Sequence, residues 1–195
     1  MKRGKTMGNE TITMKQFIQY NLIAFAAVFI SRYIIIPFDH YNIAVANYLW
    51  LPMGAGILAI VLFGNRAAFG VLAGYLVAAF IIKGGFDMAY INSYLGKVID
   101  TIAPIVAIWI MKQMNVKDYF AGGRLLYLRM LPLILITVLL ANGAKLIVYP
   151  MNGKIISDWV WFFQSYSLSA TLGSIVFIVV TLTIFKPMLV RHNII

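Results

Sequence analysis

The sequence contains no cysteine, only two histidines and only six acidic residues among 195. Without cysteine the chain forms neither disulfides nor thiolate metal sites, and the redox compartment is left undetermined. Charged residues of both signs make up 11% of the chain, against roughly 25% in soluble domains. The chain therefore has too few polar side chains to cover a soluble globule of this size.

Apolar residues are abundant instead, and they come in long blocks. They make up 62% of the chain, and the mean hydropathy is +0.88. Many blocks approach the roughly 20 residues that an α-helix needs to cross a bilayer. Because helices satisfy their backbone groups internally, as hydrocarbon requires, we expect an all-α bundle of about six membrane spans in a single domain, residues 1–195. The predicted spans are Phe17–Ile36, Ala44–Phe63, Ala67–Ile82, Ser93–Met111, Leu125–Tyr149 and Val160–Phe185.

Basic residues give the chain a net charge of +10, and most of them lie between the apolar blocks. This distribution argues against a nucleic-acid partner and is typical of the positive-inside rule of membrane proteins. With both termini in the cytoplasm, the external connections hold only Lys83 and Lys154. The cytoplasmic segments then hold Lys2, Arg3, Lys5, Lys15, Arg66, Lys112, Lys117, Arg124, Arg129, Lys186 and Arg191. We therefore predict a multi-pass protein of the cell membrane with both termini inside.

A few charged and polar residues fall within the predicted spans, where charge is costly and therefore points to function. Under the predicted orientation they lie toward the external ends of their helices. This asymmetry predicts a polar vestibule that opens outward and serves as a ligand cavity. The candidate residues of this external cluster are Arg32, Asn47, Lys97, Asp100, Asn142, Lys145 and Gln164.

Asp100 is the only acidic residue placed well inside a predicted span. Lys97 precedes it by three residues and shares its helical face, so the two can pair. Arg32 and Lys145 are alternative partners from other helices. Two roles stay open for Asp100: a structural ion pair that docks helices, and a group that binds a ligand or a proton.

The sequence carries no familiar catalytic motif. It has no HExxH, no GxSxG and no glycine-rich phosphate loop with its lysine. The two histidines, His40 and His192, fall on opposite sides of the predicted membrane and cannot share a metal ion. A lone Asp100 lacks the second group that an intramembrane protease needs. We therefore expect that the protein is not an enzyme and carries neither metal nor cofactor.

Small residues recur at helical spacing in the second and third predicted spans. Gly70 and Gly74 form a GxxxG pattern, which permits close approach of helices. Gly54 and Gly56 follow Pro52, where they favour a break or kink in the second span. Close packing is one interpretation of these residues, and a broken helix that turns its backbone dipoles toward a ligand is the other.

These residues form part of a longer pattern: Trp50-Leu51-Pro52-Met53-Gly54-Ala55-Gly56, then Leu62-Phe63-Gly64-Asn65-Arg66, then Gly70 and Gly74. The pattern resembles the early core of MASE-type membrane-associated sensor domains, and Trp161, Leu172-Gly173 and Lys186-Pro187 are similar to the closing region of that family. The family-like motif consists of Trp50, Pro52, Gly54, Gly56, Gly64, Arg66, Gly70 and Gly74.

The resemblance implies a sensory module of the bacterial inner membrane, in a family whose members are usually joined to a histidine kinase or a cyclic-dinucleotide enzyme and generally have more than six spans. Only residues 186–195 follow the last predicted span. We therefore expect this chain to act through a separate membrane or cytoplasmic partner.

The chain is also similar to the substrate-binding subunits of energy-coupling-factor vitamin transporters. These are six-helix basic proteins of comparable length with an external pocket, and Ala24, Ala26 and Ala27 match the small residues of their coupling face. A structural subunit of a membrane complex is a third alternative. The expected function is thus a non-enzymatic sensory or small-molecule-binding membrane protein, with the transporter subunit and the structural subunit as alternatives.

Overall fold

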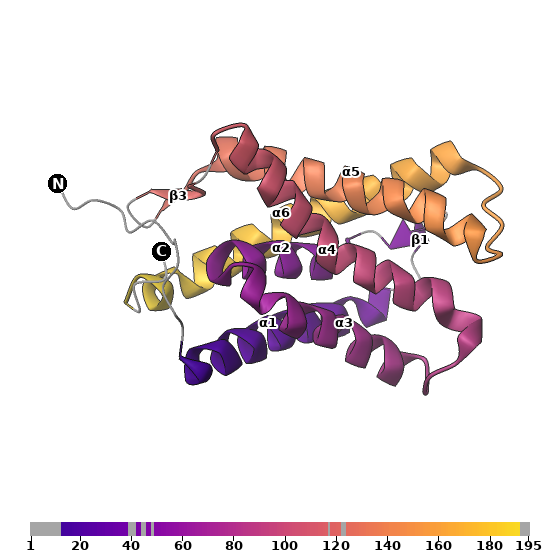
Figure 1. Cartoon of the computed structure of the whole chain (residues 1–195), viewed down its shortest axis with the longest axis horizontal. Coiled ribbons are helices and arrows are strands. Elements are labelled where there is room, and N and C mark those ends of the chain that lie inside the picture. Colours follow the sequence, from indigo (N-terminus) through magenta and orange to yellow (C-terminus); the bar gives the residue numbers. More distant parts are fainter. Residues whose placement is uncertain are drawn as a thin grey trace.

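The computed structural model describes residues 13–38, 42–43, 46–47, 49–116, 118–121 and 124–191. They form one bundle of α-helices (Figure 1), so the predicted all-α fold is confirmed. The helices are α1 (Met14–Ile35), α2 (Leu51–Phe63), α3 (Ala68–Ile82), α4 (Ile91–Gln113), α5 (Tyr127–Met151) and α6 (Trp159–Arg191). Short 3₁₀ turns lie at η1 (Ile36–Phe38), η2 (Asn65–Ala67) and η3 (Met88–Tyr90), and two small hairpins pair β1 (Asn42–Ile43) with β2 (Ala46–Asn47) and β3 (Phe120–Ala121) with β4 (Arg124–Leu125).

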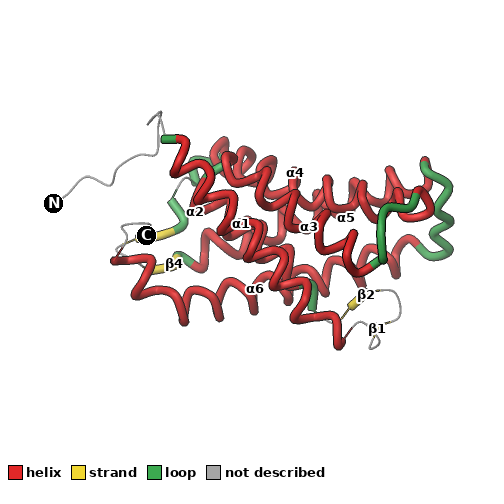
Figure 2. Tube along the Cα trace, turned by 90° about the horizontal axis from the view of Figure 1, so that it is seen from below, coloured by secondary structure: helices red, strands yellow, loops and turns green. Residues whose placement is uncertain are grey.

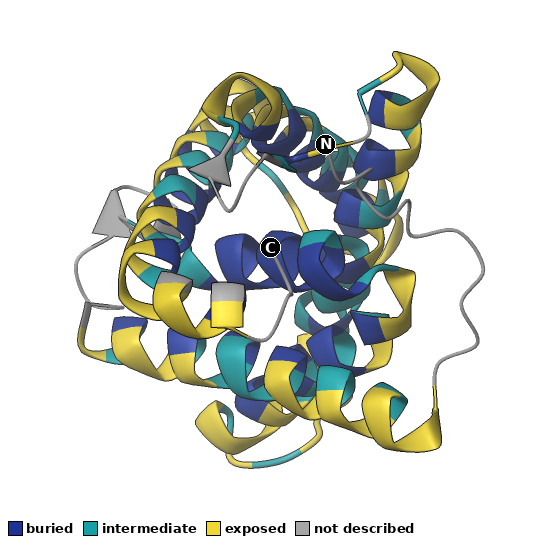
Figure 3. Cartoon of the chain, turned by 90° about the vertical axis from the view of Figure 1, so that its left-hand side faces the viewer, coloured by how far each residue is buried: buried dark blue, intermediate teal, exposed yellow. Residues whose placement is uncertain are grey.

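Five helices of the described part of the chain are long and apolar enough to cross a membrane: α1, α3 extended by η2, α4, α5 and α6. Their outer faces carry large apolar side chains, such as Leu22, Ile147 and Ile184, which are 61%, 66% and 62% exposed. Figure 3 shows the buried residues turned toward the interior of the bundle and the exposed ones outward. Soluble proteins rarely expose apolar surface on this scale. The chain is a multi-pass membrane protein whose outer surface is suited to lipid.

Helix α2 is the exception, because its 13 residues fall short of the roughly 20 that span a bilayer. Eleven of these residues are buried, and α2 contacts each of the five longer helices. It therefore forms the centre of the core, with the other helices arranged around it.

The second predicted span, Ala44–Phe63, was wrong at its beginning, because the helix starts only at Leu51. Pro52 occupies the first turn of α2, where its missing N–H leaves no helical hydrogen bond unmade. Proline therefore starts this helix rather than kinking it. The preceding backbone is fixed elsewhere, since the Trp50 N–H donates to the Ser169 carbonyl of α6 at 3.1 Å.

Three glycines of the family-like motif lie where helices approach one another closely. A side chain on Gly70 would collide with the backbone of Asn21 in α1, and one on Gly74 would lie 2.8 Å from the Phe25 carbonyl oxygen. Gly54 faces the backbone of α6 in the same way, with the Cα of Ser174 at 2.7 Å. The packing interpretation of the GxxxG pattern is confirmed.

The turn between α2 and α3 is held by a glycine and an asparagine. Gly64 ends α2 with a φ of +73°, a conformation that glycine adopts without steric cost. Asn21 of α1 then fastens the turn, because its Nδ2 donates to the Arg66 carbonyl at 2.9 Å and its Oδ1 accepts from the Gly70 N–H at 2.6 Å. This clamp fixes the third helix against the first.

The helices alternate in direction, so the beginning of α1, the α2–α3 turn, the β3–β4 hairpin and the end of α6 lie at one end of the bundle (Figures 1 and 2). The start of α1 and the end of α6 therefore lie at the same end of the bundle, although α2 is too short to cross a bilayer by itself. This end also gathers the described basic residues that were predicted to be cytoplasmic, among them Lys15, Arg66, Lys112, Arg129 and Arg191. His40 and His192 lie outside the described residues, as do Lys2, Arg3, Lys5 and Lys117.

Candidate functional site

A cavity of about 310 Å³ lies between α4, α5 and α6, near the end of the bundle that is predicted to face outward. The start of α2 closes one side of it through Trp50. Its lining is mainly polar, charged or aromatic, in contrast to the apolar core below. The lining residues are Trp50, Lys83, Ser93, Gly96, Lys97, Asp100, Asn142, Lys145, Tyr149, Lys154, Tyr166, Ser169 and Ala170.

A shallower depression of about 490 Å³ lies further out, over the connections between the helices. It is lined by residues of the α3–α4 and α5–α6 connections together with the start of α4. Lys83, Ser93 and Lys154 border both spaces. The depression therefore adjoins the cavity and forms its polar mouth.

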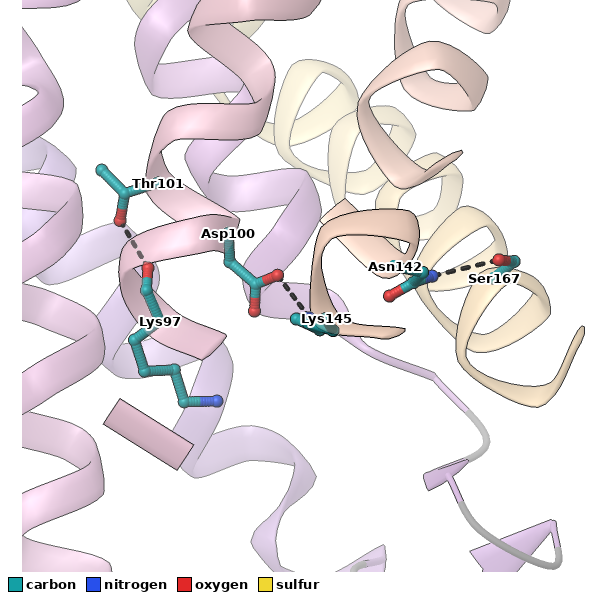
Figure 4. A network of polar contacts seen from close by, with 6 residues as sticks. All are labelled: Lys97, Asp100, Thr101, Asn142, Lys145 and Ser167. Carbon is teal, nitrogen blue, oxygen red and sulfur yellow. Dashed lines mark hydrogen bonds and ion pairs between the residues drawn. The ribbon is translucent and has the colours of Figure 1, made fainter. Parts of the chain in front are cut away.

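An ion pair between Asp100 of α4 and Lys145 of α5 forms the wall of the cavity (Figure 4). The Lys145 Nζ lies 2.5 Å from the Asp100 Oδ1, and the two residues are only 5% and 1% exposed. Of the three partners predicted for Asp100, Lys145 is the one in contact. A carboxylate at this depth requires such a partner, because a buried charge without compensation is strongly destabilising.

Lys97 lies on the same helix as Asp100 but does not join this pair (Figure 4). No ion pair or hydrogen bond of its ammonium is found within the described part of the chain. The Lys97 Nζ instead lies 4.3 Å from the centroid of the Trp50 ring and 5.6 Å from that of Tyr75. Cations over aromatic faces are attracted by the ring quadrupole, so Trp50 holds the ammonium in place without using its three hydrogen-bond donors.

Asn142 belongs to the site as predicted, whereas Gln164 does not. Asn142 is 1% exposed, and its Nδ2 donates to the Ser167 Oγ at 3.1 Å, which links α5 to α6 at the cavity wall (Figure 4). Gln164 is exposed on α6 and is not among the lining residues.

Arg32 lies beside the site rather than in its lining. Its guanidinium carbon is 5.3 Å from the centroid of the Trp50 ring, on which Lys97 also rests. The backbone of Asn47 belongs to β2, but its side chain lies outside what the structure describes. The structure thus brings together four predicted residues: Lys97, Asp100, Asn142 and Lys145.

Several lining residues were missed by the sequence reasoning. Lys83 and Lys154 were assigned to external connections, and Tyr149 was not included in the polar cluster although it lines the cavity. A signal for Tyr149 was present, because Asn142, Lys145 and Tyr149 follow one another at helical spacing and so share one face of α5. No sequence pattern of this kind identifies Lys83 and Lys154, because they come close to the cavity only when the helices pack together.

Gly96 gives the site its room. A side chain at this position would collide with the Tyr149 hydroxyl and approach the Lys145 Cε to 3.7 Å. Because Gly96 has no side chain, Tyr149 and Lys145 of α5 can pack against α4 at this position. Any larger residue here would narrow the space.

The lining carries an excess of positive charge. Four lysines and one aspartate border the cavity, a formal charge of +3. Partial burial lowers the pKa of Lys83, and repulsion by Lys154 lowers it further. The pKa of Lys154 is likewise lowered by partial burial and by repulsion from Lys145. The part of each shift that comes from a neighbouring lysine agrees with the excess of positive charge in the lining.

Comparison with models of protein families, with curated proteins and with solved structures gave no match. Neither the MASE-type resemblance nor the similarity to transporter subunits gains support from these comparisons. No group of three or more histidine, cysteine, aspartate or glutamate side chains able to hold a metal occurs within the described residues. The chemistry of the site therefore follows from its lysines, its single carboxylate and its aromatic rings.

Proposed function

We propose that this chain is a non-enzymatic membrane protein that binds a small polar molecule from the outer side of the membrane. The observation that carries the proposal is the cavity itself, where charged and polar groups from α4, α5 and α6 converge. Its volume of about 310 Å³ lies at the lower end of the roughly 300–1,000 Å³ of small-molecule sites. Ionisable groups at this depth ordinarily mark a ligand or ion path.

A purely structural role explains only part of the arrangement. The Asp100–Lys145 pair docks α4 on α5, but docking needs no empty space beside the pair. Lys97 makes no structural bond of its own within the described residues, yet its ammonium faces aromatic rings at the cavity. No histidine lines the cavity within the described part of the chain, so the base that commonly activates a serine nucleophile is not found there.

A sensory role in the bacterial inner membrane, exerted through a partner protein, is the form of this function that we favour. Trp50 both lines the cavity and precedes α2. Because α2 contacts every longer helix, a ligand that moves Trp50 acts on the whole bundle. Trp50 is also the first residue of the motif that resembles MASE-type sensor domains.

The alternative of a vitamin-type transporter subunit is less well supported by the position of the small residues on α1. Ala24 was matched to the coupling face of such subunits, but its side chain is completely buried inside the bundle. A residue in that position does not contact a partner protein. Ala26 and Ala27 are half-buried, which leaves little of the matched face accessible.

The test is a screen of small polar molecules for thermal stabilisation of the purified protein in nanodiscs. Gly96→Leu fills the cavity, because a side chain there meets Tyr149 and Lys145. Gly143→Leu is the matched control, since a Cβ on Gly143 meets nothing within 4 Å. We expect compounds that stabilise the wild type and Gly143→Leu but not Gly96→Leu. Equal stabilisation of all three proteins, or of none, contradicts the proposal.

A further inference from the structure

We infer that the ligand of this cavity is a small anion, whose negative group lies between the Lys97 ammonium and the N-terminal end of α2. This inference rests on the proposed binding function and names the chemical class of the ligand. Three independent features of the site support it: the unbalanced lysines, the position of Lys97, and the direction of α2.

Among the described residues, the lysines of the cavity outnumber the carboxylates that pair with them. Asp100 compensates Lys145, with which it forms the ion pair. Lys83, Lys97 and Lys154 also border the cavity, and no carboxylate pairs with them within the described residues. Holding several cations together in a partly buried space is unfavourable. An anionic ligand relieves that cost, whereas a cationic ligand increases it.

Lys97 is the lysine best placed to hold the anionic group. It enters the cavity from α4 beside the buried pair, and the face of Trp50 supports its ammonium at 4.3 Å. Lys83 and Lys154 lie nearer the mouth, since both also border the outer depression. The two outer lysines are therefore suited to attract an anion, and Lys97 is suited to bind it.

The start of α2 adds a second positive element on the same side. Trp50, which immediately precedes the helix, lines the cavity, and no side chain caps the first turn. The N-terminal end of a helix carries a partial positive charge. Because α2 is buried within the bundle, this charge is poorly screened by water. Short helices that begin inside membrane proteins bind anionic ligand groups in this way.

Two sources can supply such an anion, a water-soluble carboxylate or phosphate and the headgroup of an anionic lipid. We assign the site to the soluble source. The cavity shares Lys83, Ser93 and Lys154 with the polar mouth formed by the helix connections. A soluble anion reaches Lys97 through this mouth without crossing hydrocarbon.

The experiment uses the fluorescence of Trp50 as the reporter. The full chain carries Trp109→Phe, Trp159→Phe and Trp161→Phe, which leaves Trp50 alone of the four tryptophans, and is placed in nanodiscs of phosphatidylcholine at constant ionic strength. The probes are matched in shape and differ in charge: benzoate, benzamide and benzylammonium, with inorganic phosphate as a second anion. We expect a saturable change in Trp50 fluorescence with benzoate and with phosphate, and no such change with benzamide or benzylammonium.

Lys97→Met removes the proposed anion contact and is expected to weaken binding by at least about tenfold, the equivalent of one charge-assisted hydrogen bond. Lys112→Met makes the same substitution on an exposed residue at the opposite end of α4, and it should leave binding unchanged. If Lys97→Met does not fold, Lys97→Gln keeps a polar side chain and tests the same loss of charge. Lys154→Met at the mouth should weaken binding less than Lys97→Met or Lys97→Gln does.

The outcomes separate this inference from the function on which it rests. Binding of benzamide or benzylammonium as tight as that of benzoate overturns the anion assignment but leaves a small-molecule site. No response to any probe, in a protein that is shown to be folded, contradicts both. Loss of benzoate binding when phosphatidylglycerol is added, with dependence on Lys97, assigns the site to the lipid headgroup and overturns the soluble source.

Discussion

Asp100 pairs with Lys145, 45 residues further along the chain and on another helix, and not with Lys97 on its own helical face. The pair is buried, with the Lys145 Nζ 2.5 Å from the Asp100 Oδ1. Its formation leaves the Lys97 ammonium on the face of Trp50. One choice of partner therefore produces both a helix-docking contact and an available cation in the cavity.

The Asp100→Asn variant should lower the stability of the protein in detergent, because it leaves the Lys145 ammonium buried without its counter-charge. Breaking a fully buried pair costs about 3–5 kcal/mol, and we expect a loss toward the lower end because the pair borders the cavity. Thermal unfolding measures the effect. The double variant Asp100→Asn with Lys145→Met should recover much of the loss, whereas Asp100→Asn with Lys97→Met should not. Normal stability combined with lost ligand binding would instead make Asp100 a ligand contact, and no effect on either would refute both roles.

Gly70→Leu should destabilise the protein strongly, because a side chain at Gly70 collides with the backbone of Asn21. Overpacking at a tight contact typically costs about 1–3 kcal/mol, and here it also displaces the Asn21–Arg66 clamp. Gly143→Leu is the control, since the space beside Gly143 is open. Unfolding in a denaturing detergent series would measure the difference. Equal stability of the two variants would show that the α1–α3 contact is not tight.

Much of this fold was predictable, because apolar periodicity and length determine where helices can cross a membrane. The start of α2 was not predictable, since Pro52 suits either a kink or the first turn of a helix. In the structure the residue before α2 is held by a contact from a distant helix, the Trp50–Ser169 hydrogen bond. The partner of Asp100 was likewise not predictable from sequence, which left three alternatives open. Spacing along a helix identifies local pairs, whereas the Asp100–Lys145 contact depends on how α4 and α5 pack.

Anion binding should weaken as the pH rises. The weakening should begin below the pH at which a lysine of ordinary pKa loses its charge. Partial burial and neighbouring lysines lower the pKa of Lys83 and Lys154 below 10.5. Raising the pH through these lowered values removes positive charge from the border of the cavity, which Lys97, Asp100 and Lys145 also line. The ligand-free protein should respond in the opposite sense, because a lysine with a lowered folded-state pKa destabilises the fold while it is protonated. Benzoate titrations and thermal unfolding at pH 7 to 10 check both signs, and parallel changes would contradict this assignment.

Reporter fusions test the orientation on which the outward cavity depends. Fusions after Lys117 and after Arg191 should report a cytoplasmic position, and fusions near Asp87 and Gly153 should report an external one. The basis is the concentration of basic residues at one end of the bundle. An external C-terminus would place the cavity on the cytoplasmic side and exclude a ligand from outside.

Anomalous diffraction from crystals of the wild-type protein grown with 4-bromobenzoate locates the ligand most directly. Bromine scatters anomalously, so its position is found without reference to the protein density. We expect one bromine peak within the cavity that Trp50, Lys97 and Tyr166 line, with the carboxylate toward Lys97, and no such peak in crystals of Lys97→Met. A peak confined to the basic end of the bundle near Lys112 and Arg129, or an empty cavity at saturating ligand, would contradict the account.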